Sequence, residues 1–261
     1  MKNFVIKVKI ALLAATILLI SGNGLVYAKK NNVPETIEIE ARDAFKLTGT
    51  IILPPSATSK KKVPLVILVH SLGETEKSWG VLPAVINKMD FATLTFNLRG
   101  HADSVYDKND KKKYWQNFDK KEFLKYPDDI LSSIDYVKDN YPEVNTNDVA
   151  LIGADIGANS SIIAGSKYNK RIKTLILISP TMKYKGLETP IPLVAYGNHP
   201  TFIVVSSKDK FTCTSSNELI KYAQGKKSLK VLPYGGTGIN LIKNNPETMP
   251  LILDWLKENF H

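Results

Sequence analysis

Short apolar runs alternate with longer mixed segments along the chain from about residue 65 to the C-terminus. Leu65–Val69 is a continuous apolar, β-branched run, which is typical of a strand buried on both faces of a sheet. Further runs of this kind predict strands over 91–96, 149–152, 175–178, 202–205 and 229–232.

The segments between these runs have the spacing of helices. In residues 126–141, Ile130, Ile134 and Val137 fall on one stripe, which predicts an amphipathic helix. Helices are also expected over 79–88, 157–165, 216–224 and 250–260. Because strands alternate with helices, we expect an α/β fold with a doubly wound, mostly parallel sheet and helices on both of its faces.

Two segments depart from this alternation. Residues 36–41 and 46–53 read as two strands joined at Asp43, which predicts an N-terminal antiparallel pair. Residues 103–125 are polar, lysine-rich and aromatic without a clear period, which predicts a loop or small lid. We expect residues 29–261 to form a single domain, because that length suits one α/β unit.

Residues 1–28 have the pattern of a secretory signal peptide. Three early lysines precede the apolar run 10–20, and Val-Tyr-Ala at 26–28 places small residues at the −3 and −1 positions of a cleavage site. The run is too short to cross the bilayer as a helix. We therefore expect export to the periplasm, the cell envelope or the outside, with no transmembrane domain after cleavage. A membrane anchor formed by an uncleaved leader is the alternative.

Composition narrows the classes of partner. The chain is 43% hydrophobic and 23% charged, as globular proteins are, and its formal net charge is +10. One cysteine excludes an intrachain disulfide and a cysteine-rich metal site, and we expect neither a metal nor a cofactor. The lysines lie in short runs without interleaved aromatics, so nucleic-acid binding is not expected. The lysine runs fall in predicted loops, and such basic loops would attract an anionic cell-envelope polymer.

The candidate chemistry begins at Gly153-Ala154-Asp155-Ile156-Gly157, which lies between a predicted strand and a predicted helix. This is the frame of a nucleophile elbow, whose glycines permit a sharp, strained turn. The turn places the central side chain at the carboxyl edge of the sheet, where parallel sheets bind ligands. The amide of Ile156 is positioned to form half of an oxyanion hole.

Six segments in a fixed order carry a resemblance to one superfamily: LVILVHSLG at 65–73, FNLRGHADS at 96–104, LIGADIGAN at 151–159, ISPTMKYKGL at 178–187, VVSSKD at 204–209 and YGGTGINL at 234–241. On these segments the chain resembles the α/β-hydrolase superfamily from about residue 36 to 260. It is most similar to the bacterial dienelactone-hydrolase and serine-aminopeptidase-like branch. The second segment is similar to that branch's "DxRGHGxS" loop.

The resemblance assigns roles by position, and two of them fall on unexpected residues. The segment with Ser71 and Leu72 corresponds to the loop that supplies the other oxyanion amide. Asp209 stands at the position of the catalytic acid, as the family requires. Asp155 stands where the family has the serine nucleophile, and Thr237 stands where it has the catalytic histidine.

These replacements predict a catalytically impaired hydrolase. A serine nucleophile needs a base to take its proton, and the acid serves to orient that base. A carboxylate at a helix N-terminus is favourable, but its charge fills the oxyanion hole and repels an anionic transition state. The remaining pocket is expected to accept a small ester or acyl ligand.

Two other functions stay open at this point. Asp155 is a possible nucleophile, as in haloalkane dehalogenases and epoxide hydrolases, if His70 or His101 serves as a relocated base. The resemblance implies framework roles for both histidines, whereas His199 and His261 are placed poorly for catalysis. The third function is that of a basic, envelope-associated binding protein.

Overall fold

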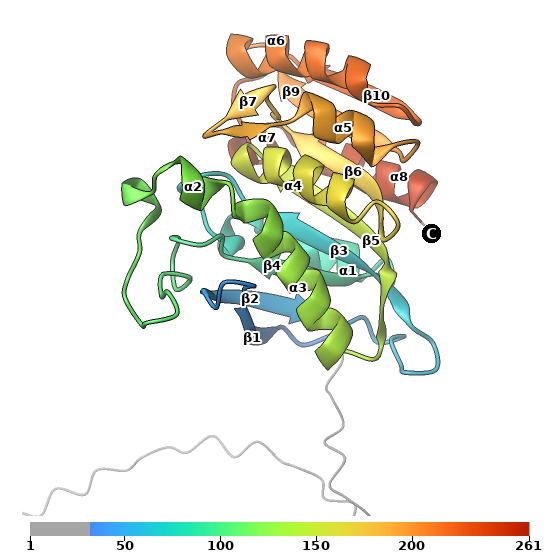
Figure 1. The fold of residues 1–261 in the computed structure, drawn as a ribbon. Helices are drawn as coiled ribbons and strands as arrows, with labels where there is room; N and C mark the ends of the chain where they lie inside the picture. Colours follow the sequence, from blue (N-terminus) through green and yellow to red (C-terminus); the bar gives the residue numbers. More distant parts are fainter. Residues whose placement is uncertain (1–31, 261) are drawn as a thin grey trace, which may run out of the picture. The chain divides into compact units, whose positions relative to one another are not determined.

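A computed structural model describes residues 32–260, which form a central eight-stranded sheet (Figure 1). The strand order is β1-β2-β4-β3-β5-β6-β9-β10. The strands are β1 (Glu35–Glu40), β2 (Lys46–Ile52), β3 (Val63–Val69), β4 (Ala92–Phe96), β5 (Val144–Ala154), β6 (Ile172–Ile178), β9 (Thr201–Ser206) and β10 (Lys227–Leu232). Strand β2 is antiparallel to both of its neighbours, and the other pairs are parallel. The predicted fold class and the N-terminal antiparallel pair are confirmed.

Helices cover both faces of the sheet (Figure 1). They are α1 (Leu82–Asn87), α2 (Lys120–Phe123), α3 (Tyr126–Asn140), α4 (Ile156–Lys167), α5 (Pro190–Tyr196), α6 (Lys210–Leu219), α7 (Ile239–Asn244) and α8 (Thr248–Asn259). Helices α3 to α6 pack on one face, whereas α1, α7 and α8 pack on the other. The domain therefore has three layers with a core on each side of the sheet.

The central strands explain why their sequences are apolar without alternation. In β3, Ile67 and Val69 belong to the core beneath α3 and α4, whereas Val66 and Leu68 belong to the core beneath α1 and α8. Each of these four side chains is completely buried. Because both faces of the strand are covered, every position must be apolar.

Helix α6 begins six residues earlier than the sequence pattern predicted, at Lys210 instead of Ser216. The side chain of Asp209 accepts a hydrogen bond from the amide of Thr212 at 3.1 Å and so caps the helix. Residues 212–216 are mostly threonine and serine, which gives the start of the helix little apolar periodicity. The cap, rather than the apolar pattern, determines where this helix starts.

The predicted helix over 79–88 is interrupted. A 3₁₀ turn at Glu76–Trp79 ends at Gly80, whose φ of 57° lies in the left-handed region, and α1 begins only at Leu82. Gly80 favours this break because a residue without a side chain adopts that conformation at little cost. The sequence pattern predicted one continuous helix here, and the structure instead has two short helical segments separated at Gly80.

Residues 103–125 form a segment that we call the lid. It contains a 3₁₀ turn at Trp115–Asn117 and helix α2, joined by irregular chain. A small hairpin of β7 (Lys183–Tyr184) and β8 (Leu187–Glu188) was not predicted, and neither were α5 and α7. Elements of two to seven residues are too short to show a period in the sequence.

Within residues 32–260, no helix combines the length and apolar character that crossing a membrane requires. The predicted signal peptide lies outside the described residues.

The close packing of α4 against the end of β3 generates a first prediction, at Gly157. A Cβ atom on Gly157 would lie 2.2 Å from the carbonyl oxygen of Val69, so Gly157→Ala forces β3 and α4 apart. We expect the variant to lose about 3 kcal/mol of unfolding free energy or to fail to fold. Urea denaturation checks this value. Gly235→Ala is the control, because a Cβ atom there meets nothing within 4 Å. Equal stability of the two variants would contradict the prediction.

Candidate active site

Asp155 occupies the tip of a sharp turn between β5 and α4. Its backbone angles are φ 53° and ψ −117°, a conformation that residues with side chains rarely adopt. A Cβ atom on Gly153 would lie 2.5 Å from the carbonyl oxygen of Gly157, so the two ends of the turn nearly touch. The Gly-x-Asp-x-Gly frame therefore forms the predicted elbow.

The carboxylate of Asp155 lies against the amides that would form an oxyanion hole. The amide of Leu72 donates a hydrogen bond to Oδ2 of Asp155 at 3.2 Å. Burial raises the pKa of Asp155, while hydrogen bonds from the amides of Leu72 and Ile156 act in the opposite direction. The nearby charge of Asp209 raises this pKa further. The side chain thus occupies the position in which a substrate oxyanion would be stabilised.

Loops from three other strands meet at the elbow. The hydroxyl of Ser71 accepts a hydrogen bond from the amide of Ile239 at 3.1 Å, and the hydroxyl of Ser179 accepts one from Gly238 at 3.0 Å. A Cβ atom on Gly238 would lie 3.2 Å from that of Asp155. The loop that contains Thr237 is therefore held against the elbow. The predicted oxyanion segment is in place, but the hydroxyl of Ser71 binds the Thr237 loop, and Leu72 provides the amide that contacts Asp155.

The residues at the acid and histidine positions do not form a relay. Thr237 is exposed, and its carbonyl oxygen accepts a hydrogen bond from Asn240 at the start of α7. The carboxylate of Asp209 caps α6, as described above. Asp209 acts on Asp155 only as a neighbouring negative charge that raises the pKa. No imidazole stands between these positions, because Thr237 replaces it.

Both histidines at this edge are tied to the backbone through both ring nitrogens. Nδ1 of His70 lies 2.8 Å from the carbonyl oxygen of Ser71, and Nε2 accepts the amide of Leu98 at 2.9 Å. Burial lowers the pKa of His70 to about 3, so the ring is neutral at pH 7 with its proton on Nδ1. Neither nitrogen is left to take a proton from water.

His101 has the same arrangement. Its Nε2 accepts the amide of Gly73 at 3.0 Å, and its Nδ1 lies 3.1 Å from the carbonyl oxygen of Arg99. Burial lowers the pKa of His101 to about 4. These contacts fit the framework roles that the resemblance implies, and they leave the role of relocated base without structural support.

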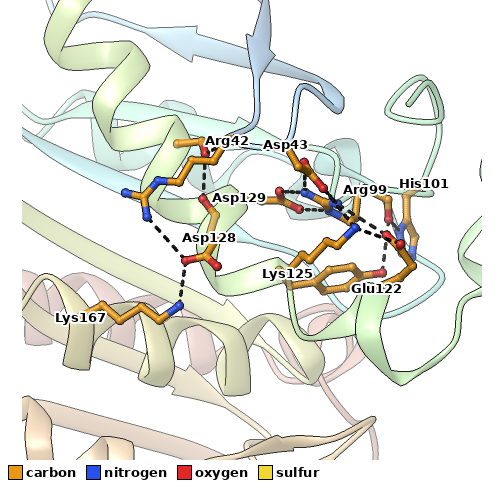
Figure 2. A network of polar contacts seen from close by, with 11 residues as sticks. Arg42, Asp43, Arg99, His101, Glu122, Lys125, Asp128, Asp129 and Lys167 are labelled. Carbon is orange, nitrogen blue, oxygen red and sulfur yellow. Dashed lines mark hydrogen bonds and ion pairs between the residues drawn. The ribbon is translucent and has the colours of Figure 1, made fainter. Parts of the chain in front are cut away.

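A buried ion network anchors the turn that carries His101. Figure 2 shows the guanidinium of Arg99 between the carboxylates of Asp129 and Asp43, with Lys125 beside Asp43. Nε of Arg99 donates to Asp129 at 2.7 Å, and Nη1 donates to Asp43 at 2.9 Å. Arg99 and Asp129 are fully buried, so their charges depend on each other for compensation. The turn is thereby fixed to α3.

Two aromatic residues near the site were missed at the level of sequence. Tyr184, in the β7–β8 hairpin, lies close enough to Asp155 for that charge, together with burial, to raise the pKa of the phenol. Trp115, in the lid, stacks on His101 with ring centres 5.4 Å apart and planes 7° apart. Both belong to irregular or very short segments, so no periodic signal marked them.

Across the described part of the chain, no three histidine, cysteine, aspartate or glutamate side chains gather in a way that would hold a metal ion.

Comparison with known families gives a match over more than half of the chain. The family model described as "Serine aminopeptidase, S33" matches residues 60–197, which include the elbow and the Arg99 turn. Among curated proteins, none matches the chain.

Solved structures share the fold. A dienelactone hydrolase from Anabaena variabilis superposes with a TM-score of 0.64 at 13% identity, covering 88% of this chain and 99% of that one. Est1E from Butyrivibrio proteoclasticus, solved with ferulic acid, gives 0.63 at 20% identity, covering 85% and 96%. An acylaminoacyl peptidase from Pyrococcus horikoshii gives 0.68 at 14% identity, covering 89% and 42%. At these identities the likeness establishes the fold and not the activity.

The environment of Asp155 predicts how Asp155→Asn changes stability with pH. The folded-state pKa is raised, so ionising Asp155 opposes folding. The protonated carboxyl group of Asp155 contributes to stability. This contribution is fully present below the pKa of the unfolded chain, about 3.9, and is lost as pH rises through the folded-state pKa. We expect the unfolding free energy of the variant, minus that of the wild type, to increase from pH 4 to pH 7. Urea titrations at both pH values measure this. A difference in unfolding free energy that stays constant, or that changes in favour of the wild type, would contradict the prediction.

Proposed function

Since the chain belongs to the serine aminopeptidase S33 family of α/β hydrolases, we propose that it is an exported member that no longer hydrolyses esters or amides through a seryl intermediate. The observation that carries the proposal is the contact between the Asp155 carboxylate and the amides of Leu72 and Ile156. In acyl transfer these amides stabilise the oxygen that becomes negative in the transition state. Here a carboxyl group of the protein already lies against them.

The lack of a base supports the same conclusion. General-base catalysis contributes ~10²–10⁴ to the rate of such enzymes. The hydroxyl of Thr237 has no basicity near neutral pH that would replace an imidazole. An ester formed on Asp155 would therefore be hydrolysed slowly, because no group activates the attacking water. Turnover through an aspartyl intermediate is disfavoured for this reason, and the backbone contacts of His70 and His101 strengthen the argument.

The function that remains is ligand binding on a hydrolase scaffold. The ferulic acid in the Est1E structure shows that a protein of this fold accepts an aromatic acid. In this chain the charge of Asp209 beside the Asp155 carboxyl group disfavours a free carboxylate. We propose that the ligand is a neutral ester or acyl compound, for which Tyr184 offers an aromatic surface beside the elbow.

Export rests on the leader pattern in residues 1–28. We expect the protein to be found outside the cytoplasm with a mature N-terminus at Lys29. Cell fractionation followed by N-terminal sequencing tests this. Recovery of the full-length chain in the membrane fraction would show instead that the leader anchors the protein.

The central prediction is a restoration of activity. The wild type should hydrolyse p-nitrophenyl acetate no faster than the buffer does. Asp155→Ser combined with Thr237→His should raise the rate by ~10²-fold or more, because it restores both a nucleophile and its base. Either substitution alone should stay near the wild-type rate, since the two groups act as a unit.

Two controls make the result decisive. Adding Asp209→Asn to the double variant should remove most of the restored activity, because the acid orients the new histidine. Circular dichroism shows whether each variant is folded. Wild-type hydrolysis that disappears in Asp155→Asn would contradict the proposal.

A further inference from the structure

The turn Arg99-Gly100-His101 joins three parts of the protein that are far apart in sequence. Arg99 fixes the turn to α3 through Asp129, as Figure 2 shows. His101 accepts the amide of Gly73 and so holds the loop that follows β3. The amide of Trp115 donates to the carbonyl oxygen of Gly100 at 3.2 Å, which joins the lid to the same turn.

The lid packs on this turn without space between them. A Cβ atom on Gly100 would lie 2.6 Å from the backbone nitrogen of Trp115 and 2.7 Å from the ring of Phe118. Gly100 has a φ of 82°, so a side chain there would be strained as well as crowded. The close approaches of Trp115 and Phe118 to Gly100 indicate that the lid and the turn form one packed unit.

Trp115 reaches the oxyanion loop in two ways. One face of its indole stacks on the His101 imidazole. Its Cζ2 atom would also lie 3.4 Å from a Cβ atom on Gly73, which is ordinary van der Waals distance. The next residue back along that loop is Leu72, whose amide contacts the Asp155 carboxylate. A continuous line of contacts thus runs from the lid to the elbow.

We propose that Trp115 is a positioning residue that, through His101 and Gly73, holds the Leu72 amide against the Asp155 carboxylate. Trp115 does not touch Asp155 and takes no part in chemistry. Its indole prevents the His101 ring from tilting, and a fixed ring keeps its Nε2 directed at the amide of Gly73. The lid therefore governs the geometry of the Leu72 amide.

This inference rests on the proposed function in one respect, namely that the Asp155 carboxylate occupies those amides. The charged and polar groups that face Asp155 are the amides of Leu72 and Ile156, the carboxylate of Asp209 and the phenol of Tyr184. Of these, only the Leu72 amide belongs to the loop that Trp115 contacts. A change at Trp115 should therefore reach Asp155 through that amide.

The test compares Trp115→Ala and Trp115→Phe with Tyr114→Ala. Tyr114 is the neighbouring lid residue, and its side chain is exposed. Two quantities are measured by nuclear magnetic resonance in the full chain. The first is hydrogen exchange at the Gly73 amide, and the second is the pKa of the Asp155 carboxyl group, followed through the chemical shift of its carbon. The Asp155 signal is assigned by its absence from the spectrum of Asp155→Asn.

In Trp115→Ala we expect exchange at Gly73 to become faster by on the order of tenfold, because an aromatic stacking contact is lost. The pKa of Asp155 should rise, since a hydrogen bond that favours the charged form is weakened. Trp115→Phe should give intermediate values, and Tyr114→Ala should match the wild type.

Wild-type exchange at Gly73 in folded Trp115→Ala would overturn the proposal. If that variant does not fold, Trp115→Phe decides the question: faster exchange at Gly73 supports the proposal and wild-type exchange overturns it. Esterase activity does not enter the test. A failure here would therefore leave the proposed loss of hydrolysis standing, and hydrolysis by the wild type would leave the exchange result interpretable.

Discussion

The hydrogen bond from the Leu72 amide to the Asp155 carboxyl group, which also lies beside the amide of Ile156, determines what this hydrolase fold is able to do. The elbow, the strand order and the convergence of loops at the carboxyl edge all present a side chain to two backbone donors. With serine at the tip, those donors would be free for a substrate. With aspartate the protein's own carboxyl group occupies them, and the same architecture that favours acyl transfer in the family opposes it here.

The site is held by backbone contacts from buried polar side chains rather than by relays between side chains. His70 fixes Leu98, His101 fixes Gly73, and Ser71 and Ser179 fix the loop around Gly238. Behind them the Arg99–Asp129 pair ties the turn to α3. The framework is therefore complete even though the catalytic positions have changed. Such a framework would keep the elbow and the amides around it in place after the chemistry was lost.

The apolar pattern predicted the parallel strands well because burial on both faces favours apolar residues at successive positions, as in β3. It failed where local chemistry decides: Asp209 starts α6 before any apolar stripe appears, and Gly80 interrupts a segment that is apolar on one face. The glycine spacing identified Asp155 and Ile156, whereas Thr237 and Asp209 were recognised only through family resemblance. The sequence did not reveal the roles of Trp115 and Tyr184, nor the contact that the Ser71 hydroxyl makes. These contacts join segments far apart in sequence, which no local pattern records.

The chemical state of the Asp155 carboxylate after exposure to substrate tests the central claim most directly. Incubating the protein with activated esters, an epoxide and a haloalkane in H₂¹⁸O, followed by peptide mass spectrometry, shows whether that carboxylate ever acts as a nucleophile. We expect no adduct and no ¹⁸O in the peptide that contains Asp155. Incorporation of ¹⁸O there would mean that an aspartyl ester forms and is hydrolysed, and the claim of lost catalysis would be wrong.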